Sequence, residues 1–290
     1  MQSATTMIGN TLQQGRKYPT IKVCAFTYGD LVPATHETLL RECMYAISKN
    51  VTIKYDGRAG GALIDKARSA AMFKWWQHGE EDIMCMVDHD MDFKAGDLIE
   101  TARLAYEHQV PVGGMYSKKS FGLGFACCDG EIDKDLTIGI GDHRVEKMTR
   151  LGGGFMCIPR NVPNILWQKL NIESEPWKKR MRRAMERGSI NQCIRLTNLA
   201  IRLIQPGNKE QPGENVDFFR QFVGQNSKGI WNWFGEDFSF CERCVDCGII
   251  PQINTAIGPR HWGPWPFSIH DAGRKWPPEA KHDENNPFGK

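Results

Sequence analysis

The sequence has no long apolar run, no strong excess of charge of one sign and no internal repeats. No stretch approaches the roughly 20 apolar residues that a membrane-spanning helix needs. The 37 basic side chains nearly balance the 34 acidic ones, and the formal net charge is only +3. Any attraction to nucleic acid must therefore come from a local patch and not from the chain as a whole.

The first 19 residues also lack the apolar core of a secretion signal. We therefore expect a soluble, cytoplasmic protein. Thiols stay reduced in that compartment, so we expect the ten cysteines to pack as thiols and not to form a disulfide framework.

Strand-like and helix-like patterns alternate in the first half of the chain. Short β-branched or apolar runs predict strands at 21–27, 51–55, 83–87 and 110–116. Apolar residues at helical spacing predict helices at 36–48, 62–76 and 97–108. This alternation is typical of an α/β fold with a mostly parallel sheet, in which ligands bind outside the carboxyl ends of the strands.

The second half is less regular. Residues 121–140, rich in Gly and Asp, predict loops and short edge strands. Further along we expect a glycine-rich turn entering a strand at 152–159, helix at 177–204, a loop at 206–226, and a helix at 238–247 that Gly248 ends.

The strongest chemical signal is Asp88-His89-Asp90, which directly follows the apolar run at 83–87. If strand alternation continues through this motif, both carboxylates face one point on a solvent-facing rim of the sheet, and His89 faces away. Two carboxylate ligands suit Mg²⁺ or Mn²⁺. The pattern is common, and two solvated aspartates in a turn are the alternative.

Two further motifs carry candidate groups. Glu236 and Asp237 stand at the start of a predicted helix, where the helix dipole keeps a carboxylate ionised and able to accept a proton. A helix cap is the alternative there. His261, in the motif at 260–263, is a candidate metal ligand or a packed side chain.

The order of these motifs resembles the GT-A glycosyltransferases, in particular the small bacterial and phage-type members related to the large inverting family. The likeness spans residues 21–263 and leaves out the stretch between Arg160 and Trp231. It is carried by the strand at 21–27 and by six motifs: Ala67-Arg68-Ser69, VDHDMDF, VGGMYSKK, GGGFMCIPR, GEDFSFCERC and RHWG. Ser69 departs from the family, which often has Asn there.

The resemblance implies a domain layout and a fold. Residues 20–270 would form a GT-A (Rossmann-like) catalytic domain, with a mostly parallel sheet flanked by helices. Residues 160–231 would be a helical insert and a possible acceptor-binding region. Residues 1–19 would be an N-terminal extension, and 271–290 a polar tail.

The resemblance also implies residue roles on the donor and acceptor sides. The nucleoside would be bordered by Phe26, Thr27 and Tyr28. Arg68 would face the donor, and Asp88 would lie near the ribose or donor sugar. The acceptor side would be shaped by Gly153, Gly154 and Phe155.

Metal and proton-transfer roles follow from the same resemblance. Asp90 would bind Mn²⁺ or Mg²⁺, with His261 as a second ligand and Asp88 beside them. Asp237 would be the catalytic base, with Glu236 as the second choice. The implied reaction moves a sugar from a UDP- or GDP-sugar donor to an acceptor hydroxyl, with inversion. The metal offsets the charge of the leaving diphosphate. A retaining mechanism would need no base.

A basic run in the predicted insert bears on the acceptor. It consists of Lys178, Lys179, Arg180, Arg182, Arg183 and Arg187. Such a run can track phosphates, and some phage enzymes of this class glycosylate modified DNA bases, so DNA is one candidate acceptor. Contact with anionic lipid during lipid or polysaccharide glycosylation is a second candidate. A solvated helix face is the plain alternative.

Other interpretations of the sequence stay open. A nucleotidyltransferase can share the sheet and the carboxylate pair, but it would release pyrophosphate. A non-catalytic nucleic-acid-binding protein would use only the basic run. The spacing of Cys241, Cys244 and Cys247 begins an iron–sulfur pattern, but no cysteine follows Cys247 to complete it, so we expect packed thiols.

Overall fold

The computed structural model describes residues 17–27, 32–59, 63–117, 145–204, 215–225, 230–263 and 266–267. Tyr28, the segment 121–140 and the predicted tail at 271–290 lie outside these ranges, as do residues 1–16 of the predicted N-terminal extension. The expectations for them stay predictions.

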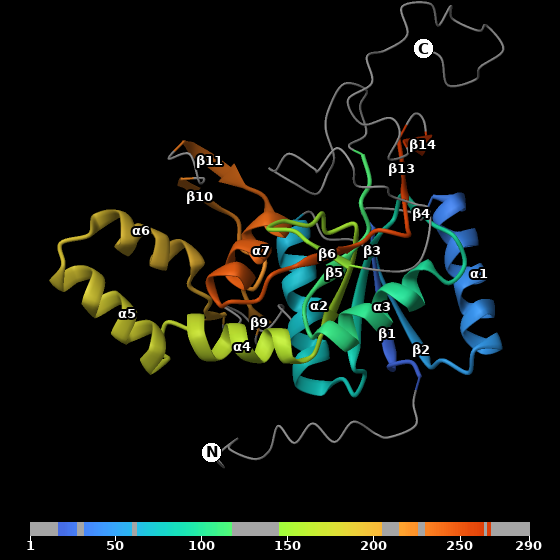
Figure 1. The fold of residues 1–290 in the computed structure, drawn as a ribbon, viewed down its shortest axis with the longest axis horizontal. Helices are drawn as coiled ribbons and strands as arrows, with labels where there is room; N and C mark the ends of the chain where they lie inside the picture. Colours follow the sequence, from blue (N-terminus) through green and yellow to red (C-terminus); the bar gives the residue numbers. More distant parts are fainter. Residues whose placement is uncertain are drawn as a thin grey trace, which may run out of the picture.

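A seven-stranded sheet forms the centre of the molecule (Figure 1). In spatial order its strands are β2 (Ile53–Ala59), β1 (Ile21–Thr27), β3 (Ile83–Asp88), β7 (Phe155–Pro159), β5 (Val112–Gly113), β12 (Gln252–Asn254) and β6 (Val145–Lys147). Strands β2, β1, β3, β5 and β12 run in one direction, whereas β7 and β6 run against their neighbours. The predicted α/β fold with a mostly parallel sheet is confirmed.

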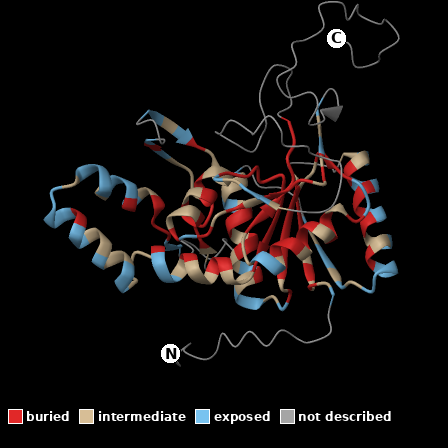
Figure 2. Ribbon diagram, viewed as in Figure 1, coloured by how far each residue is buried: buried red, intermediate tan, exposed pale blue. Residues whose placement is uncertain are grey.

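Helices pack on both faces of this sheet. One face carries α1 (Pro33–Ser48) and α3 (Asp97–His108), and the other carries α2 (Ile64–His78), α4 (Asn161–Leu170) and α7 (Glu236–Asp246). Side chains along β1 alternate between the two layers, because successive residues of a strand point to opposite faces. Val23 and Ala25 join the α1 and α3 layer, whereas Cys24 and Phe26 join the other. Figure 2 shows the resulting buried centre.

Two helices extend away from this body. They are α5 (Glu175–Glu186) and α6 (Ile190–Leu199), which pack against each other and expose much of their surface (Figures 1 and 2). The helix expected at 177–204 is confirmed over most of its length, but it is divided into α5 and α6, because the chain turns at Gly188, which has a φ of +61°. Left-handed backbone of this kind favours glycine and ends a helix.

Short strands complete the described chain. The region expected to be a loop at 206–226 contains β9 (Asn215–Val216), which pairs with β8 (Leu203–Ile204), and β10 (Phe222–Gln225), which pairs with β11 (Trp231–Phe234). A third small sheet joins β4 (Met91–Asp92), β13 (Arg260–Trp262) and β14 (Pro266–Phe267).

The cysteines of the possible cluster motif lie on α7 and at its end. Cys241, Cys244 and Cys247 are all buried within the apolar core that α7 shares with α2 and α4. Within the described ranges, no helix combines the length and the apolar character that crossing a membrane requires.

Candidate active site

Arg68 on α2 joins three of the sequence motifs at one end of the sheet. Its guanidinium donates from Nη2 to Oδ1 of Asp88, the last residue of β3, at 2.6 Å. From Nη1 it donates to Oε1 of Glu236, the first residue of α7, at 2.7 Å. The same group lies over the ring of Phe26, 5.8 Å from its centroid. One side chain thus fixes the ends of β1, β3 and α7 against α2.

The charge of Arg68 is fully compensated. Only 2% of this side chain is exposed. Burial alone would lower the pKa of the guanidinium, but the carboxylates of Asp88, Glu236 and Asp237 raise that pKa above its ordinary value. Both terminal nitrogens bind protein carboxylates, so the contacts that the structure shows are positioning contacts. A contact between Arg68 and a donor stays a prediction.

Two glycines make room for these charged groups. A Cβ atom at Gly153 would lie 2.0 Å from Nη1 of Arg68, and one at Gly154 would lie 2.8 Å from Oη of Tyr116 and 3.1 Å from Oδ2 of Asp88. The Gly154 amide donates to Oη of Tyr116 at 2.8 Å. Because any side chain would collide here, the sequence needs glycine for close approach of the backbone.

Asp237 is held differently from Glu236. Its Oδ1 accepts the N–H of Phe238 at 2.7 Å, and its Oδ2 accepts the N–H of Gly153 at 3.2 Å. Burial, followed by the charge of Glu236, raises the pKa of Asp237 to about 6, although Arg68 and the two amides act in the opposite direction. At a pKa of about 6 this carboxylate is raised above its ordinary value but is still mostly ionised at pH 7. A base with a pKa near the working pH is better suited to proton transfer.

Asp90 is buried, with 3% of its surface exposed, so the expectation of a solvent-facing rim is wrong. Strand β3 ends at Asp88 and the chain turns, so strand alternation does not reach Asp90. His89 does not face away either: its Nε2 lies 3.8 Å from Oδ2 of Asp90. Nε2 of His261 lies 3.4 Å from Oδ1, the other carboxylate oxygen of Asp90.

Pairing between β13 and β4 brings His261 to this place. In the register of these strands His261 stands opposite Met91, and the Trp262 amide donates to the carbonyl of Asp90 at 2.7 Å. The His261 ring packs edge-on against Tyr116, with centroids 5.4 Å apart. Tyr116 thus contacts both the glycine turn and the histidine. Sequence reasoning missed its role, although Tyr116 lies within the motif VGGMYSKK.

The pair Asp90 and His261 could hold a divalent cation. A carboxylate oxygen and an imidazole nitrogen both suit Mn²⁺. Mg²⁺ at nucleotide sites is usually held by one or two carboxylates together with substrate phosphates. Among the described residues no three His, Cys, Asp or Glu side chains group into a complete metal site. Asp90 and His261 therefore fit a cation that shares its ligand shell with a substrate.

The remaining aspartate of this loop is structural. Asp92 accepts from Oγ1 of Thr38 at 2.7 Å and forms an ion pair with Arg260. These contacts tie β4 to α1 and β13.

The basic run lies on α5 and its end and divides into two groups. Lys178 pairs with Glu173 at 3.1 Å, and Arg180 pairs with Asp246 at 2.7 Å. The other four side chains are exposed and share one side of the helix, at spacings of three and four residues. They are Lys179, Arg182, Arg183 and Arg187.

Comparison with known proteins gives no family assignment. No protein-family model and no curated protein sequence matches the chain. Two similar solved structures are A197 from STIV, and GalNAc-T7 with UDP, GalNAc and Mn²⁺. The first is 11% identical with a TM-score of 0.44, and the match covers 84% of this chain and 86% of that one. The second is 9% identical with a TM-score of 0.44, and the match covers 91% of this chain but only 46% of that one. Likeness at this level carries no conclusion about activity.

Proposed function

We propose that the protein is a divalent-metal-dependent glycosyltransferase of the GT-A type, which moves a sugar from a UDP- or GDP-sugar to an acceptor hydroxyl. One observation carries the proposal: the ion pairs of Arg68 join the motif of Asp88 to that of Glu236 and Asp237, beside the glycine turn. These motifs are far apart in sequence, and they are the ones on which the resemblance depends.

The donor side of the proposed site lies at the ends of β1 and β3. Phe26 and Thr27 would border the nucleoside, and Asp88, held by Arg68, would face the ribose or donor sugar. Asp90 and His261 would hold Mn²⁺ or Mg²⁺. When bound, the cation offsets negative charge on the leaving nucleoside diphosphate.

The acceptor side lies at the start of α7. Asp237 would accept the proton of the attacking hydroxyl, because its carboxylate is bound only by amides in the contacts described and its pKa is raised to about 6. Glu236 is a poorer candidate, since its Oε1 is committed to the guanidinium of Arg68. Gly153 and Gly154 would leave the acceptor room to approach.

DNA is one candidate for the acceptor, and the four exposed cations Lys179, Arg182, Arg183 and Arg187 support it. Phosphate contacts by such side chains position a nucleic acid without reading its sequence.

A donor-hydrolysis screen with UDP- and GDP-sugars, with and without Mn²⁺, tests the proposal. We expect hydrolysis of at least one donor, its loss in EDTA and its recovery on adding Mn²⁺. Asp90→Asn keeps the volume of this buried side chain and should lower hydrolysis by about 10²–10³, the usual cost of removing one electrostatic partner. Circular dichroism melting of the variant checks that it folds.

Full hydrolysis in EDTA would contradict the metal, and no hydrolysis of any donor would contradict the transferase. Release of pyrophosphate from a nucleoside triphosphate would make the protein a nucleotidyltransferase instead.

A further inference from the structure

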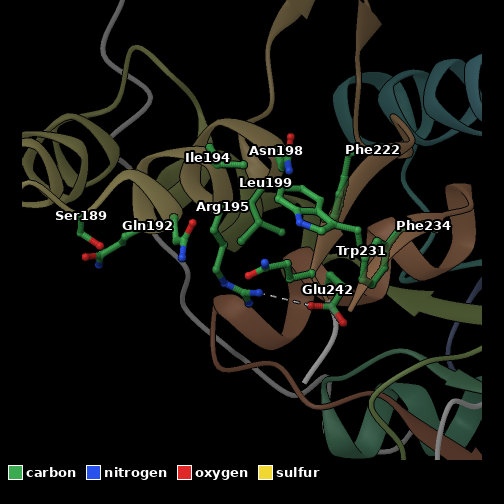
Figure 3. Close-up of a pocket in the computed structure, with 13 residues that line it drawn as sticks. Ser189, Gln192, Ile194, Arg195, Asn198, Leu199, Phe222, Trp231, Phe234 and Glu242 are labelled. Carbon is green, nitrogen blue, oxygen red and sulfur yellow. Dashed lines mark ion pairs between the residues drawn. The ribbon is translucent and has the colours of Figure 1, made fainter. Parts of the chain in front are cut away.

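A cavity of about 390 Å³ lies between α6, the β10–β11 hairpin and α7 (Figure 3). Its size falls in the range of pockets that hold small molecules, about 300–1,000 Å³. None of the residues proposed to bind donor, metal or acceptor proton lines it. It is nevertheless connected to that site through α7, because Asp237 and the lining residue Glu242 belong to the same helix.

One end of the cavity is aromatic. Phe222 and Phe234 stack with ring centroids 4.9 Å apart and an interplanar angle of 24°. Trp231 joins them in the lining and is 53% exposed. Figure 3 shows these rings gathered at one end, with Ser189 and Gln192 at the other. An exposed indole beside a cavity costs free energy in water, and it offers a flat apolar face to a ligand.

The polar lining is mostly neutral. Its hydroxyl and amide side chains are Ser189, Asn191, Gln192, Asn198 and Gln225. An amide carries both hydrogen-bond donors and an acceptor, which matches a hydroxyl group that also does both. These groups suit a ligand that carries many hydroxyls.

The two charged lining residues compensate each other. Nη1 of Arg195 lies 3.7 Å from Oε2 of Glu242, and its Nε lies 3.6 Å from Oδ1 of Asp246. Glu242 also pairs with Arg150 at 3.1 Å. None of the described lining residues comes from α5, which carries the exposed basic run. Phosphate recognition needs available cations, so this lining does not favour a nucleotide or nucleic acid.

We propose that this cavity binds a neutral saccharide unit, with the Trp231 ring against the apolar face of the sugar and the amides on its hydroxyls. Glu242 follows Asp237 by five residues, about 7.5 Å along the axis of α7 and about 140° around it. An acceptor that reaches from the cavity to Asp237 must therefore extend around the helix as well as along it, which needs an oligosaccharide of several units. The cavity is then a subsite for a saccharide acceptor. That role rests on the proposed function, whereas the binding of a saccharide to the cavity does not.

Saturation-transfer NMR on the full chain, without nucleotide or metal, tests the binding. The probes are maltohexaose, cellohexaose, mannohexaose and chitohexaose, with a single-stranded oligothymidylate for comparison. We expect at least one hexasaccharide to bind, and Trp231→Ala to weaken it about tenfold, as truncation of a central aromatic contact does. Trp233→Ala is the matched control, because Trp233 is exposed on the same strand, donates to Gln221 and does not line the cavity.

Gln192→Ala is a second test, needed in case Trp231→Ala disturbs the fold of the β10–β11 hairpin. Gln192 is exposed on α6 at the opposite end of the cavity, so its replacement should weaken binding without disturbing the fold. Absence of binding by all four hexasaccharides at millimolar concentration would overturn the proposal. Equal losses in Trp231→Ala and Trp233→Ala would do so as well. Binding of oligothymidylate alone, lost in Trp231→Ala, would replace it with stacking of nucleobases.

The two proposals fail separately. Saccharide binding without hydrolysis of any nucleotide-sugar would contradict the transferase and leave the cavity proposal standing. Donor hydrolysis without saccharide binding would contradict the cavity proposal and leave the transferase standing.

Discussion

The charges around Arg68 and those on α5 are used in opposite ways. At the end of the sheet one buried guanidinium is bound by two carboxylates, whereas along α5 four cations are exposed to solvent. A buried charge needs a fixed partner, because losing its hydration is costly. An exposed charge contributes little to stability and stays available to a partner. Changes in the first region should therefore affect catalysis and folding, and changes in the second should affect only binding.

Asp237→Asn should have the largest effect. The amide keeps the shape of the side chain but removes its basicity, so transfer should fall by about 10²–10⁴ while donor binding changes little. Rate measurements with saturating donor check this. Glu236→Gln should be milder, because its oxygen can still accept from Arg68. If Glu236→Gln is inactive and Asp237→Asn is active, the base is Glu236 and not Asp237.

The raised pKa of Asp237 makes both activity and stability depend on pH, in opposite directions. As a base it must be ionised, so kcat/KM should fall below pH 6, and the Asn variant should lose this limb of the profile.

The stability of the protein should respond to the same group. The pKa of Asp237 in the folded state, about 6, lies above the ordinary value of 3.8. The folded state therefore holds this proton more tightly, and the stabilisation is complete below about pH 3.8 and lost as pH rises through about 6. Urea unfolding across this range should show a smaller decline in Asp237→Asn.

Arg68→Met should have the next largest effect, and it acts on the fold. Removing one partner of a buried ion pair costs about 3–5 kcal/mol, because the remaining charges stay desolvated. Here the carboxylates of Asp88, Glu236 and Asp237 lose their cation. The loss should be greater at pH 8 than at pH 5, because Asp237, whose pKa is raised to about 6, can take up a proton at the lower pH. Urea unfolding measures it.

The control is Arg182→Met, the same substitution on the exposed side of α5. It should change the free energy of unfolding by no more than about 0.5 kcal/mol. Equal losses in both variants would contradict the contrast between the two regions.

Gly153→Ala should have an intermediate effect. Its Cβ would lie 2.0 Å from Nη1 of Arg68, so the bridge to Asp88 and Glu236 must shift. Overpacking of this kind costs about 1–3 kcal/mol, and transfer should fall as the carboxylates move. Gly235→Ala is the matched control, because its Cβ would meet only Oδ1 of Asp237, at an ordinary 3.4 Å. Thermal unfolding should show a clearly larger loss of stability in Gly153→Ala than in Gly235→Ala.

The sequence predicts the first half of the fold well. Helix α3 has the bounds expected for it, Asp97–His108, and β1 has those expected at 21–27. These elements have strong apolar periodicity and lie in the core, where local pattern and tertiary packing agree. Helix α7, Glu236–Asp246, also lies close to the bounds expected at 238–247. Between Arg160 and Trp231 the prediction is weaker, because the helical stretch expected at 177–204 breaks at Gly188, and β9 and β10 lie where a loop was expected.

The candidate site, like the fold, was predicted only in part. The candidate residues could be chosen from motifs, but their partners could not. The ion pair between Arg68 and Glu236 joins positions 168 residues apart, and no local pattern specifies it. Burial of Asp90 was mispredicted because β3 ends at Asp88, so the alternation of strand faces could not be extended through the turn. Buried charge pairs are decided by tertiary packing, which a single sequence does not reveal.

Neutralising the exposed cations of α5 should have the smallest effect on the protein itself. Changing Lys179, Arg182, Arg183 and Arg187 to Gln should alter stability by no more than about 0.5 kcal/mol per site and leave donor hydrolysis intact, because these side chains are exposed on α5, away from the proposed catalytic groups. If the protein binds DNA, its affinity should fall, and the slope of log K against log salt should flatten by about 0.9 for each phosphate that the variant no longer neutralises. Lys178→Gln with Arg180→Gln is the control, since these two pair with Glu173 and Asp246 and should contribute little to that slope. A slope that is unchanged by the fourfold variant would make this side of α5 a solvated surface, and the acceptor would then have to be recognised elsewhere on the molecule.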